Sequence, residues 1–216
     1  MPSSALAKLR SNLVDVHRLI ESHSDLGGEA RGRRSLGHIT RAGVLLLCAA
    51  WERYIELLLA ESVGVLCEAM PLPTDLPKPV QKHLSTLVKE ARHQLRPLHL
   101  AGEGWKLVYK SYAQDAAASL NTPSSKNIDR LFLDFIGLGA VSQSWSQGVA
   151  AVDAFVTLRG DVAHRGREAQ YIRIENLRDF RTLLLATAID TDNGLSDYLK
   201  ATCPGGERPW NRARAT

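Results

Sequence analysis

The sequence predicts an all-α protein. Its 216 residues are 44% hydrophobic and 23% charged but only 6% aromatic. Leu, Ala, Arg and Glu are frequent, and these residues favour helices over strands. Apolar residues recur at steps of three and four along most of the chain, as they do on one face of a helix. The one short extended pattern lies at residues 171–174, and we find no internal repeat and no heptad run.

The first two predicted helices carry the clearest patterns. A helix over residues 3–24 has an apolar stripe made of Leu6, Leu9, Leu13, Val16 and Ile20. Gly27 and Gly28 end it. A longer helix over residues 35–69 is apolar almost all round between residues 44 and 50, so we expect it to be the central, buried helix. Four prolines then impose a loop: Pro71, Pro73, Pro77 and Pro79.

Five further helices are predicted. Two span residues 80–93 and 105–120, and a short one carries an apolar face of Ile128, Leu131, Phe132, Phe135 and Ile136. The next runs from residue 148 to about 159, with Val149, Val152, Phe155 and Val156 facing inward. The last spans residues 175–200, with Leu177, Phe180, Leu184 and Ile189 buried. We expect one domain over residues 1–200, followed by a flexible basic tail over 201–216.

Composition and charge limit the class of protein. No apolar run reaches the roughly 18 residues that a membrane span needs, and the N-terminus lacks the layout of a signal peptide. Cys48, Cys67 and Cys203 have no pair spacing, which indicates reduced thiols. The net charge is only +4. We therefore expect a soluble, cytoplasmic domain that contacts no membrane.

Several kinds of site are excluded by their missing motifs. The chain has no phosphate-binding loop, no Gly-x-Gly-x-x-Gly, no His-Glu-x-x-His and no Cys-x-x-Cys. It also has no Glu-x-Lys, the usual core of many metal-dependent nucleases. We therefore predict no cofactor and no metal site. The dispersed histidines are expected at the surface or the edge of the core: His17, His23, His38, His83, His93 and His99.

One segment, residues 158–167, concentrates groups that can act on RNA: Arg159, Asp161, His164, Arg165 and Arg167. The structural alternative is a helix C-terminus, where basic residues complement the dipole and glycines end the helix. For cleavage without a metal, histidine suits the proton transfers, and arginine suits the phosphate because its fork binds two oxygens. One His164 cannot easily be acid and base in one step. Two copies facing each other across a dimer axis could, and the same symmetry supplies two copies of Arg159.

The spacing of this pair poses a geometric question. On an uninterrupted helix, positions five apart point about 140° away from each other. Either the helix distorts near Gly160, or the Arg159 side chain folds back toward His164.

Basic residues form two clusters along the chain, and such clusters can hold phosphates of RNA without reading its sequence. The first is Arg31, Arg33, Arg34 and Arg41, and the second is Arg159, Arg165, Arg167 and Arg173.

The sequence resembles the HEPN superfamily at several of these places. Arg159 and His164 match its Arg-x4–6-His signature, preceded by an apolar helix and followed by Arg165 and Gly166. Residues 41–56, which include Glu52, resemble the aliphatic, Glu-bearing helix of the RiboL-PSP and MAE-type HEPN branches. Residues 127–132 and 135–138 resemble a mid-chain stretch of the same branches. Together these matches span roughly residues 41–185.

The resemblance implies a compact helical bundle that dimerises and forms a composite cleft at its two-fold axis. It implies a metal-independent endoribonuclease of tRNA or mRNA, typically a toxin or an antiphage effector with an antitoxin or defence-system partner. Arg159 and His164 would be the catalytic pair, Asp161 and Glu52 would support them, and Arg165 and Arg167 would bind phosphates.

The chain also departs from the family pattern. The position after the arginine is usually polar, and here it is Gly160; Asp161 would stand in for it one residue later. The tyrosine that is often found two residues after the histidine, as an AMPylation target, is replaced by Gly166. Two alternatives therefore stay beside the free nuclease. One is a non-catalytic helical module that binds RNA or a protein, and the other is a toxin-like subunit held inactive by an antitoxin.

Overall fold

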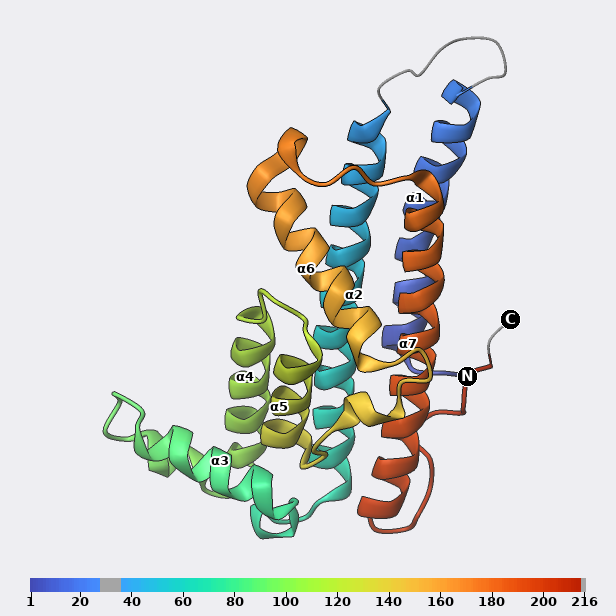
Figure 1. The fold of residues 1–216 in the computed structure, drawn as a ribbon. Helices are drawn as coiled ribbons and strands as arrows, with labels where there is room; N and C mark the ends of the chain where they lie inside the picture. The colour runs from blue at the N-terminus through green and yellow to red at the C-terminus, as the bar shows by residue number, and fades with distance from the viewer. Residues whose placement is uncertain (28–35, 215–216) are drawn as a thin grey trace.

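The computed structural model of the chain describes residues 1–27 and 36–214. Within these ranges every regular element is helical, which confirms the all-α prediction (Figure 1). The α-helices are α1 (Ser4–Gly27), α2 (Gly37–Ala69), α3 (Lys78–Lys89), α4 (Gly104–Ala118), α5 (Ser125–Ile136), α6 (Val149–Arg165) and α7 (Ile174–Thr202). Four 3₁₀ helices lie between them: η1 (Pro73–Asp75), η2 (Arg96–Leu100), η3 (Val141–Ser144) and η4 (Gly166–Glu168).

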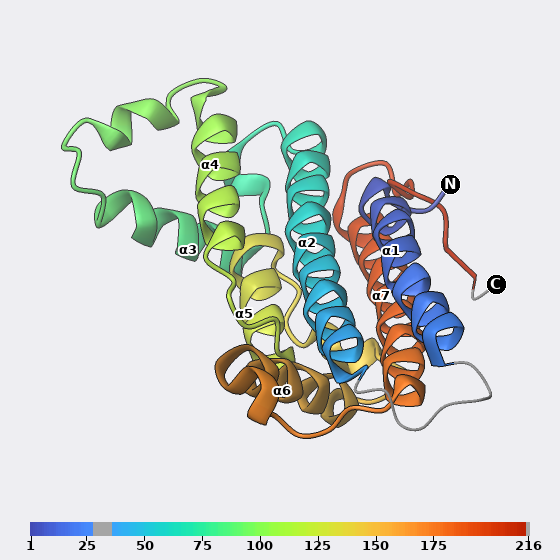
Figure 2. The ribbon, with the colours of Figure 1, turned by 90° about the horizontal axis from the view of Figure 1, so that it is seen from above.

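Helix α2 is the central helix, as its apolar composition predicts. It contacts α1 and α7 on one side, α4 and α5 on the other, and α6, which crosses it (Figures 1 and 2). Its largest side chain, Trp51, is fully buried, and Tyr54 is 1% exposed. The side chains of α2 therefore join the α1–α7 half of the bundle to the α4–α5 half in one hydrophobic core.

The predicted apolar stripes of α1 and α5 are confirmed. The five stripe residues of α1 are all buried, and so are the five of α5. Burying each such side chain contributes roughly 1.5–3 kcal/mol relative to leaving it exposed. These stripes attach α1 along α2 and α7, and α5 between α2 and α3.

Helix α6 is longer than the sequence predicts. The sequence predicts an end near Arg159, but the helix runs through Gly160 and ends at Arg165, where Gly166 takes a positive φ of 53°. Gly160 has no positive φ, so it continues the helix rather than ending it. Val149, expected to face inward, is 36% exposed because it is the first residue of the helix, whereas Val152 and Phe155 are fully buried.

Helix α3 is shorter at its C-terminal end than the sequence predicts. It starts at Lys78, with Pro79 in its first turn, and ends at Lys89 rather than near residue 93. Val88 is the last buried residue of this helix. Beyond Val88 no apolar side chain of this helix is buried, so nothing in the core stabilises a further turn.

Serine side chains and carboxylates fix the connections around α6. Asp153 accepts hydrogen bonds from the N–H and Oγ of Ser125, at 2.8 and 2.7 Å, which joins α6 to the start of α5. Asp190 of α7 accepts from the N–H and Oγ of Ser146, at 2.8 and 2.6 Å, just before α6 begins. The bonds of Ser125 hold the first turns of α6 against α5, and the bonds of Ser146 hold the residues before α6 against α7.

The C-terminal segment packs against the bundle, which differs from the flexible tail that the sequence predicts. Trp210 is 6% exposed, and its indole Nε1 donates to the carbonyl oxygen of Asp192 at 3.1 Å. Ser196 donates to the Trp210 carbonyl at 2.6 Å. Asp197 forms ion pairs with Arg208 and Arg212. One aromatic side chain and these pairs therefore attach a segment whose composition alone predicts disorder.

No helix in the described part of the chain is long and apolar enough to cross a bilayer. The three cysteines, Cys48, Cys67 and Cys203, are free thiols.

Candidate functional site

Arg159 lies where three parts of the bundle meet. It extends from α6 toward α2, and its Nη2 donates to Oε1 of Glu52 at 3.1 Å. Its Nη1 donates to the carbonyl oxygen of Asn121, in the turn between α4 and α5, at 3.4 Å. The Arg159 side chain is 29% exposed and that of Glu52 is 20% exposed. The guanidinium is therefore held by a carboxylate and a carbonyl while part of it stays accessible.

The residue next to Glu52 fixes the surroundings of this ion pair. Trp51 donates from its indole Nε1 to the Pro123 carbonyl at 3.2 Å, which attaches the α4–α5 turn to α2. The Trp51 ring stacks on Tyr54, with ring centroids 5.5 Å apart. Tyr54 in turn donates to the Ala188 carbonyl of α7 at 2.7 Å. The acceptors of Arg159 are thus positioned by the core and not by a free loop.

Burial perturbs the acidic groups beside Arg159. Burial raises the pKa of Glu52, and the positive charge of Arg159 opposes that rise. One turn earlier on α2, Cys48 lies with its Sγ 4.0 Å from Oε1 of Glu52. Burial, with a further contribution from Glu52, raises the pKa of Cys48 to about 12. Cys48 is therefore a protonated donor to Glu52 near neutral pH, not a thiolate nucleophile.

His164 lies in the last turn of α6 and is exposed. Neither geometric alternative from the sequence occurs, because α6 is continuous through Gly160 and Arg159 turns to Glu52. The structure gives no hydrogen bond between Arg159 and His164, both of which it describes. Within one chain the two side chains therefore leave the helix on faces about 140° apart.

Gly160 and Asp161 differ in what surrounds them. A Cβ at Gly160 would meet no atom within 4 Å, so packing does not require glycine there. Asp161 pairs with Nε of Arg165 at 3.0 Å and accepts from the backbone N–H of Gln170 at 3.2 Å. The Asp161 carboxylate thus holds the turn after α6.

The predicted phosphate-binding residues are accessible. Arg165 has a side chain that is 70% exposed, even though it pairs with Asp161. Arg167 is exposed in η4, directly after the positive-φ Gly166. Together with the exposed His164 they give this end of α6 a basic surface, whereas the exposed Arg173 lies at the start of α7. Of the other basic cluster, Arg31, Arg33 and Arg34 lie outside the described residues.

The first half of α2 carries an exposed apolar stripe beside this surface. Leu45 and Leu46 are 39% and 38% exposed, and Ala42 and Ala49 are exposed as well. These four positions follow the helical steps of three and four. Leu45 and Ala49 precede Glu52 by seven and three residues, on the same side of α2, and α2 also contacts η4. We define these four residues as the α2 stripe.

In the described part of the chain, no group of three or more His, Cys, Asp or Glu side chains is arranged to hold a metal ion. The sequence indicates Arg159, His164 and Glu52 as site residues, but it does not indicate Asn121, Cys48 or Trp51. The Asn121 contact is made by its backbone carbonyl, so no pattern of side chains in the sequence predicts it.

The fold and these residues define a class: an all-helical bundle with an Arg-x4-His segment at the end of one helix and a glutamate on the central helix. The RiboL-PSP-HEPN family model matches residues 11–197 of the chain. The chain therefore belongs to the RiboL-PSP-HEPN family, within the HEPN superfamily. No curated protein and no solved structure matches the chain.

Proposed function

We propose that the protein is a metal-independent endoribonuclease that acts as a homodimer through Arg159 and His164. HEPN domains are often ribonucleases, and the family match covers both residues. The observation that carries the proposal is the placement of Arg159. A guanidinium has five N–H donors, and Glu52 and Asn121 take two, which leaves three for a phosphate.

The chemistry uses the histidine twice. A neutral His164 from one copy removes the proton from the 2′-hydroxyl of the RNA, and the 2′-oxygen attacks the adjacent phosphorus. The bond from phosphorus to the 5′-oxygen breaks, and a protonated His164 from the other copy gives that oxygen its proton. The products are a 2′,3′-cyclic phosphate and a free 5′-hydroxyl. Arg159 binds the phosphate oxygens, where negative charge develops in the transition state.

A second copy answers the geometric problem of the single chain. Because Arg159 and His164 leave α6 on different faces, one chain does not present both to the same phosphate. An isologous dimer places the same residues twice in one cleft. The α2 stripe is an apolar surface beside the basic end of α6. We propose that it packs against the same stripe of the second copy in the dimer.

Glu52 acts in this proposal as a positioning residue. Its partly buried carboxylate directs Arg159 away from bulk water, and its hydrogen bond with the guanidinium fixes one edge of the fork. Such a charge-assisted bond is stronger than a neutral one. Arg165 and Arg167 then hold flanking phosphates of tRNA or mRNA without reading the bases.

We further propose a toxin or antiphage setting, in the cytoplasm, with an antitoxin or defence-system protein as partner. This setting follows from the family resemblance. It predicts that expression of the active protein alone arrests growth, and that the His164→Ala variant does not.

A second function, a non-catalytic module that binds RNA or a protein, is favoured by two observations. His164 has no hydrogen bond with any described residue that would orient its ring, and Gly160 replaces the usual polar residue. This alternative predicts that RNA binds without being cut and that His164→Ala changes binding little.

One assay separates these proposals: cleavage of pooled tRNA and mRNA in EDTA by wild type, His164→Ala and Arg159→Ala. His93→Ala and Arg130→Ala are matched controls, since both side chains are exposed and lie outside the Arg159–His164 segment. The nuclease proposal expects cleavage by the wild type and both controls only. Equal cleavage by all five proteins would indicate a contaminant, and binding without cleavage would favour the module.

A further inference from the structure

Residues 78–110 form a corner of the bundle that projects away from α1 and α7 (Figures 1 and 2). This segment contains α3, η2 and the first turns of α4, and we call it the α3–η2 arm. The arm lies at the opposite end of α4 from the candidate nuclease site, because the Asn121 carbonyl that binds Arg159 follows the C-terminus of α4. A helix of 15 residues is about 22 Å long, so the two surfaces are separate.

The α3–η2 arm holds more positive charge than the chain as a whole. It has seven lysines and arginines and two glutamates, a formal charge of +5, whereas the whole chain carries +4. Glu103 pairs with Lys106 inside the arm. Lys89, Arg92 and Lys110 are exposed, and none of them has a hydrogen bond or an ion pair with a described residue. These three side chains are therefore free to bind the acidic groups of a partner.

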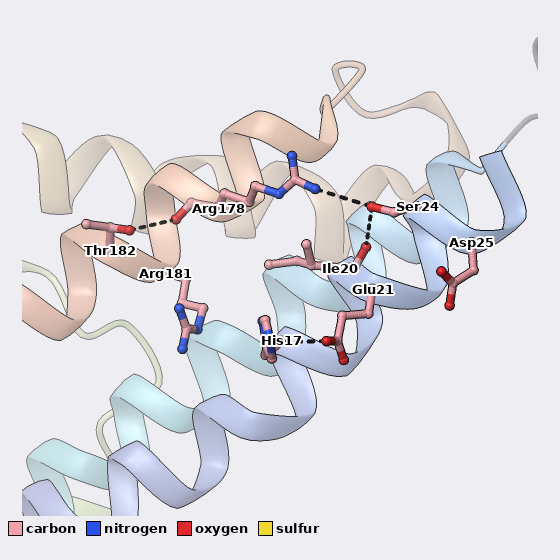
Figure 3. A pocket seen from close by; sticks show the side chains of 8 residues that line it. All are labelled: His17, Ile20, Glu21, Ser24, Asp25, Arg178, Arg181 and Thr182. Carbon is pink, nitrogen blue, oxygen red and sulfur yellow. Dashed lines mark hydrogen bonds and ion pairs between the residues drawn. The ribbon is translucent and has the colours of Figure 1, made fainter. Parts of the chain in front are cut away.

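The groove between α1 and α7 has no such excess of charge (Figure 3). It is lined by two arginines, Arg178 and Arg181, and by two carboxylates, Glu21 and Asp25. Arg178 also donates to Oγ of Ser24 at 3.2 Å. Outside the arm the chain carries a formal charge of −1, so the net positive charge of the protein comes from the arm.

Exposed leucines accompany the charges of the arm. Leu98 and Leu107 are 68% and 74% exposed, more than any other leucine in the described chain, and Leu95 is 57% exposed. Leu95 and Leu98 are three positions apart at η2, where side chains at this spacing eclipse each other, so they share one face. The exposed Arg92 precedes Leu95 by three residues. Apolar side chains gathered at the surface and rimmed by polar ones mark interaction sites.

The 3₁₀ helix η2 is held firmly against α4. A Cβ at Gly104 would clash with the carbonyl oxygen of His99, so glycine allows this close approach. Nε of Arg96 donates to the hydroxyl of Tyr112 at 3.2 Å, and the guanidinium lies over the Tyr112 ring, 4.9 Å from its centroid. Leu107 follows Gly104 by three positions, on the same side of α4. The three exposed leucines therefore border a fixed contact between η2 and α4.

From this combination we infer that the α3–η2 arm binds an acidic segment of another protein that carries apolar side chains on one face. Carboxylates of the segment pair with Lys89, Arg92 and Lys110, and its apolar side chains cover Leu95 and Leu98. Burial of the leucines supplies affinity, and charge complementarity supplies orientation and a fast association. The inference does not rest on the proposed nuclease function, because the arm shares no residue with that site.

The exposed leucines favour a protein partner over RNA or a membrane. RNA phosphates bind lysine and arginine but leave leucines in contact with water. Single strands also stack on exposed aromatic rings, whereas Trp105 and Tyr109 of the arm are buried. Helices that lie on membranes present a long apolar face, and η2 has only five residues. An acidic protein segment matches both the cations and the leucines.

Fluorescence anisotropy with the full-length protein tests this inference. The probes are three labelled peptides of about 18 residues, or five helical turns. The first has leucines at helical steps of three and four and glutamates elsewhere. The second replaces its glutamates by glutamine, and the third replaces its leucines by serine. We expect the first to bind with a dissociation constant of about 100 μM or tighter, and the other two at least about tenfold more weakly.

Two double variants show whether the arm is the site. Leu95→Ser combined with Leu98→Ser, and Lys89→Gln combined with Arg92→Gln, should each weaken binding of the first peptide about tenfold. These four side chains are exposed, so the variants should fold, and circular dichroism and melting curves check this.

Matched single variants lie outside the arm. Val14→Ser changes an apolar side chain of α1 that is 45% exposed, and Arg130→Gln changes a basic side chain of α5 that is 82% exposed. Both should bind the first peptide as the wild type does. RNA cleavage by all these variants should also equal that of the wild type, so a failure of the nuclease proposal and a failure of this inference are distinguishable.

Three results would overturn the inference. The first is that the glutamate–leucine peptide does not bind, or binds no better than the two other peptides. The second is that both double variants bind it as tightly as the wild type. The third is that no peptide binds while the Lys89→Gln, Arg92→Gln variant weakens binding to single-stranded RNA or to phosphatidylserine vesicles. The arm would then serve a nucleic acid or a lipid surface.

Discussion

The guanidinium of Arg159 and the carboxylate of Glu52 form an ion pair that joins α6 to α2, with Nη2 3.1 Å from Oε1. The two residues are 107 positions apart in the chain. Both side chains are partly buried, so solvent screens the pair less than it screens a surface salt bridge. The pair fixes the direction of the one arginine that the family signature identifies.

Replacing Glu52 tests its positioning role. We expect Glu52→Gln to lower kcat about ten- to hundredfold, because the charge-assisted bond that directs Arg159 is lost. KM for RNA should change little. Glu56→Gln is the matched control, since Glu56 also pairs with an arginine of α2, Arg53, at 2.8 Å. An equal loss in both variants, or a change confined to KM, would contradict the role.

Replacing Gly160 should improve the protein, in contrast to replacing Glu52. It lies inside α6, and a side chain there would meet no atom within 4 Å. Gly160→Ala should therefore raise the free energy of unfolding by roughly 0.5–1 kcal/mol. Gly160→Asn, which restores a polar side chain beside Arg159, should increase cleavage. Thermal melts and the RNA assay check the two outcomes, and a destabilised Gly160→Ala would show that this part of α6 is packed differently.

The α2 stripe gives a prediction about assembly. In the proposed dimer, Leu45→Lys would bury an unpaired charge in the contact, so we expect this variant to be a monomer that does not cleave RNA. Leu107→Lys is the control, since Leu107 is 74% exposed on α4. Light scattering measures the mass of each variant. A Leu45→Lys protein that stays dimeric and active would place the interface elsewhere.

Asp192 gives a prediction about pH. Burial raises the pKa of Asp192 from 3.8 to about 6, although hydrogen bonds from Ser3 oppose the rise. Between these two pH values the folded state binds more protons than the unfolded state, so stability falls as pH rises. Asp192→Asn should remove this fall, which amounts to at most about 3 kcal/mol. Asp190→Asn is the control, because Asp190 accepts hydrogen bonds from the N–H and Oγ of Ser146, as Asp192 does from those of Ser3. Urea unfolding at several pH values measures the effect.

The sequence predicts the helices well where one face carries a regular apolar stripe, as in α1 and α5. It predicts the end of α6 poorly, because Gly160 and the basic residues after it look like a helix terminus. A single glycine without positive φ costs only about 1 kcal/mol, and the packing of Val162, which is 3% exposed, outweighs it. The C-terminal segment is basic, so its composition predicts a flexible tail. The burial of one residue, Trp210, holds it against the bundle instead.

The candidate site could be predicted only in part for a related reason. The Arg-x4-His spacing and the glutamate of α2 are visible in the sequence. The contact of Arg159 with the Asn121 carbonyl depends on a turn that Trp51 holds through a long-range hydrogen bond.

The most direct test of the nuclease proposal is the chemistry of the RNA ends after digestion in EDTA. We expect fragments with 2′,3′-cyclic phosphates and 5′-hydroxyls, made by the wild type and absent with His164→Ala. Fragments with 5′-phosphates would contradict attack by the 2′-hydroxyl. Intact RNA bound equally by both proteins would show that Arg159 and His164 form a binding surface and not a catalytic pair.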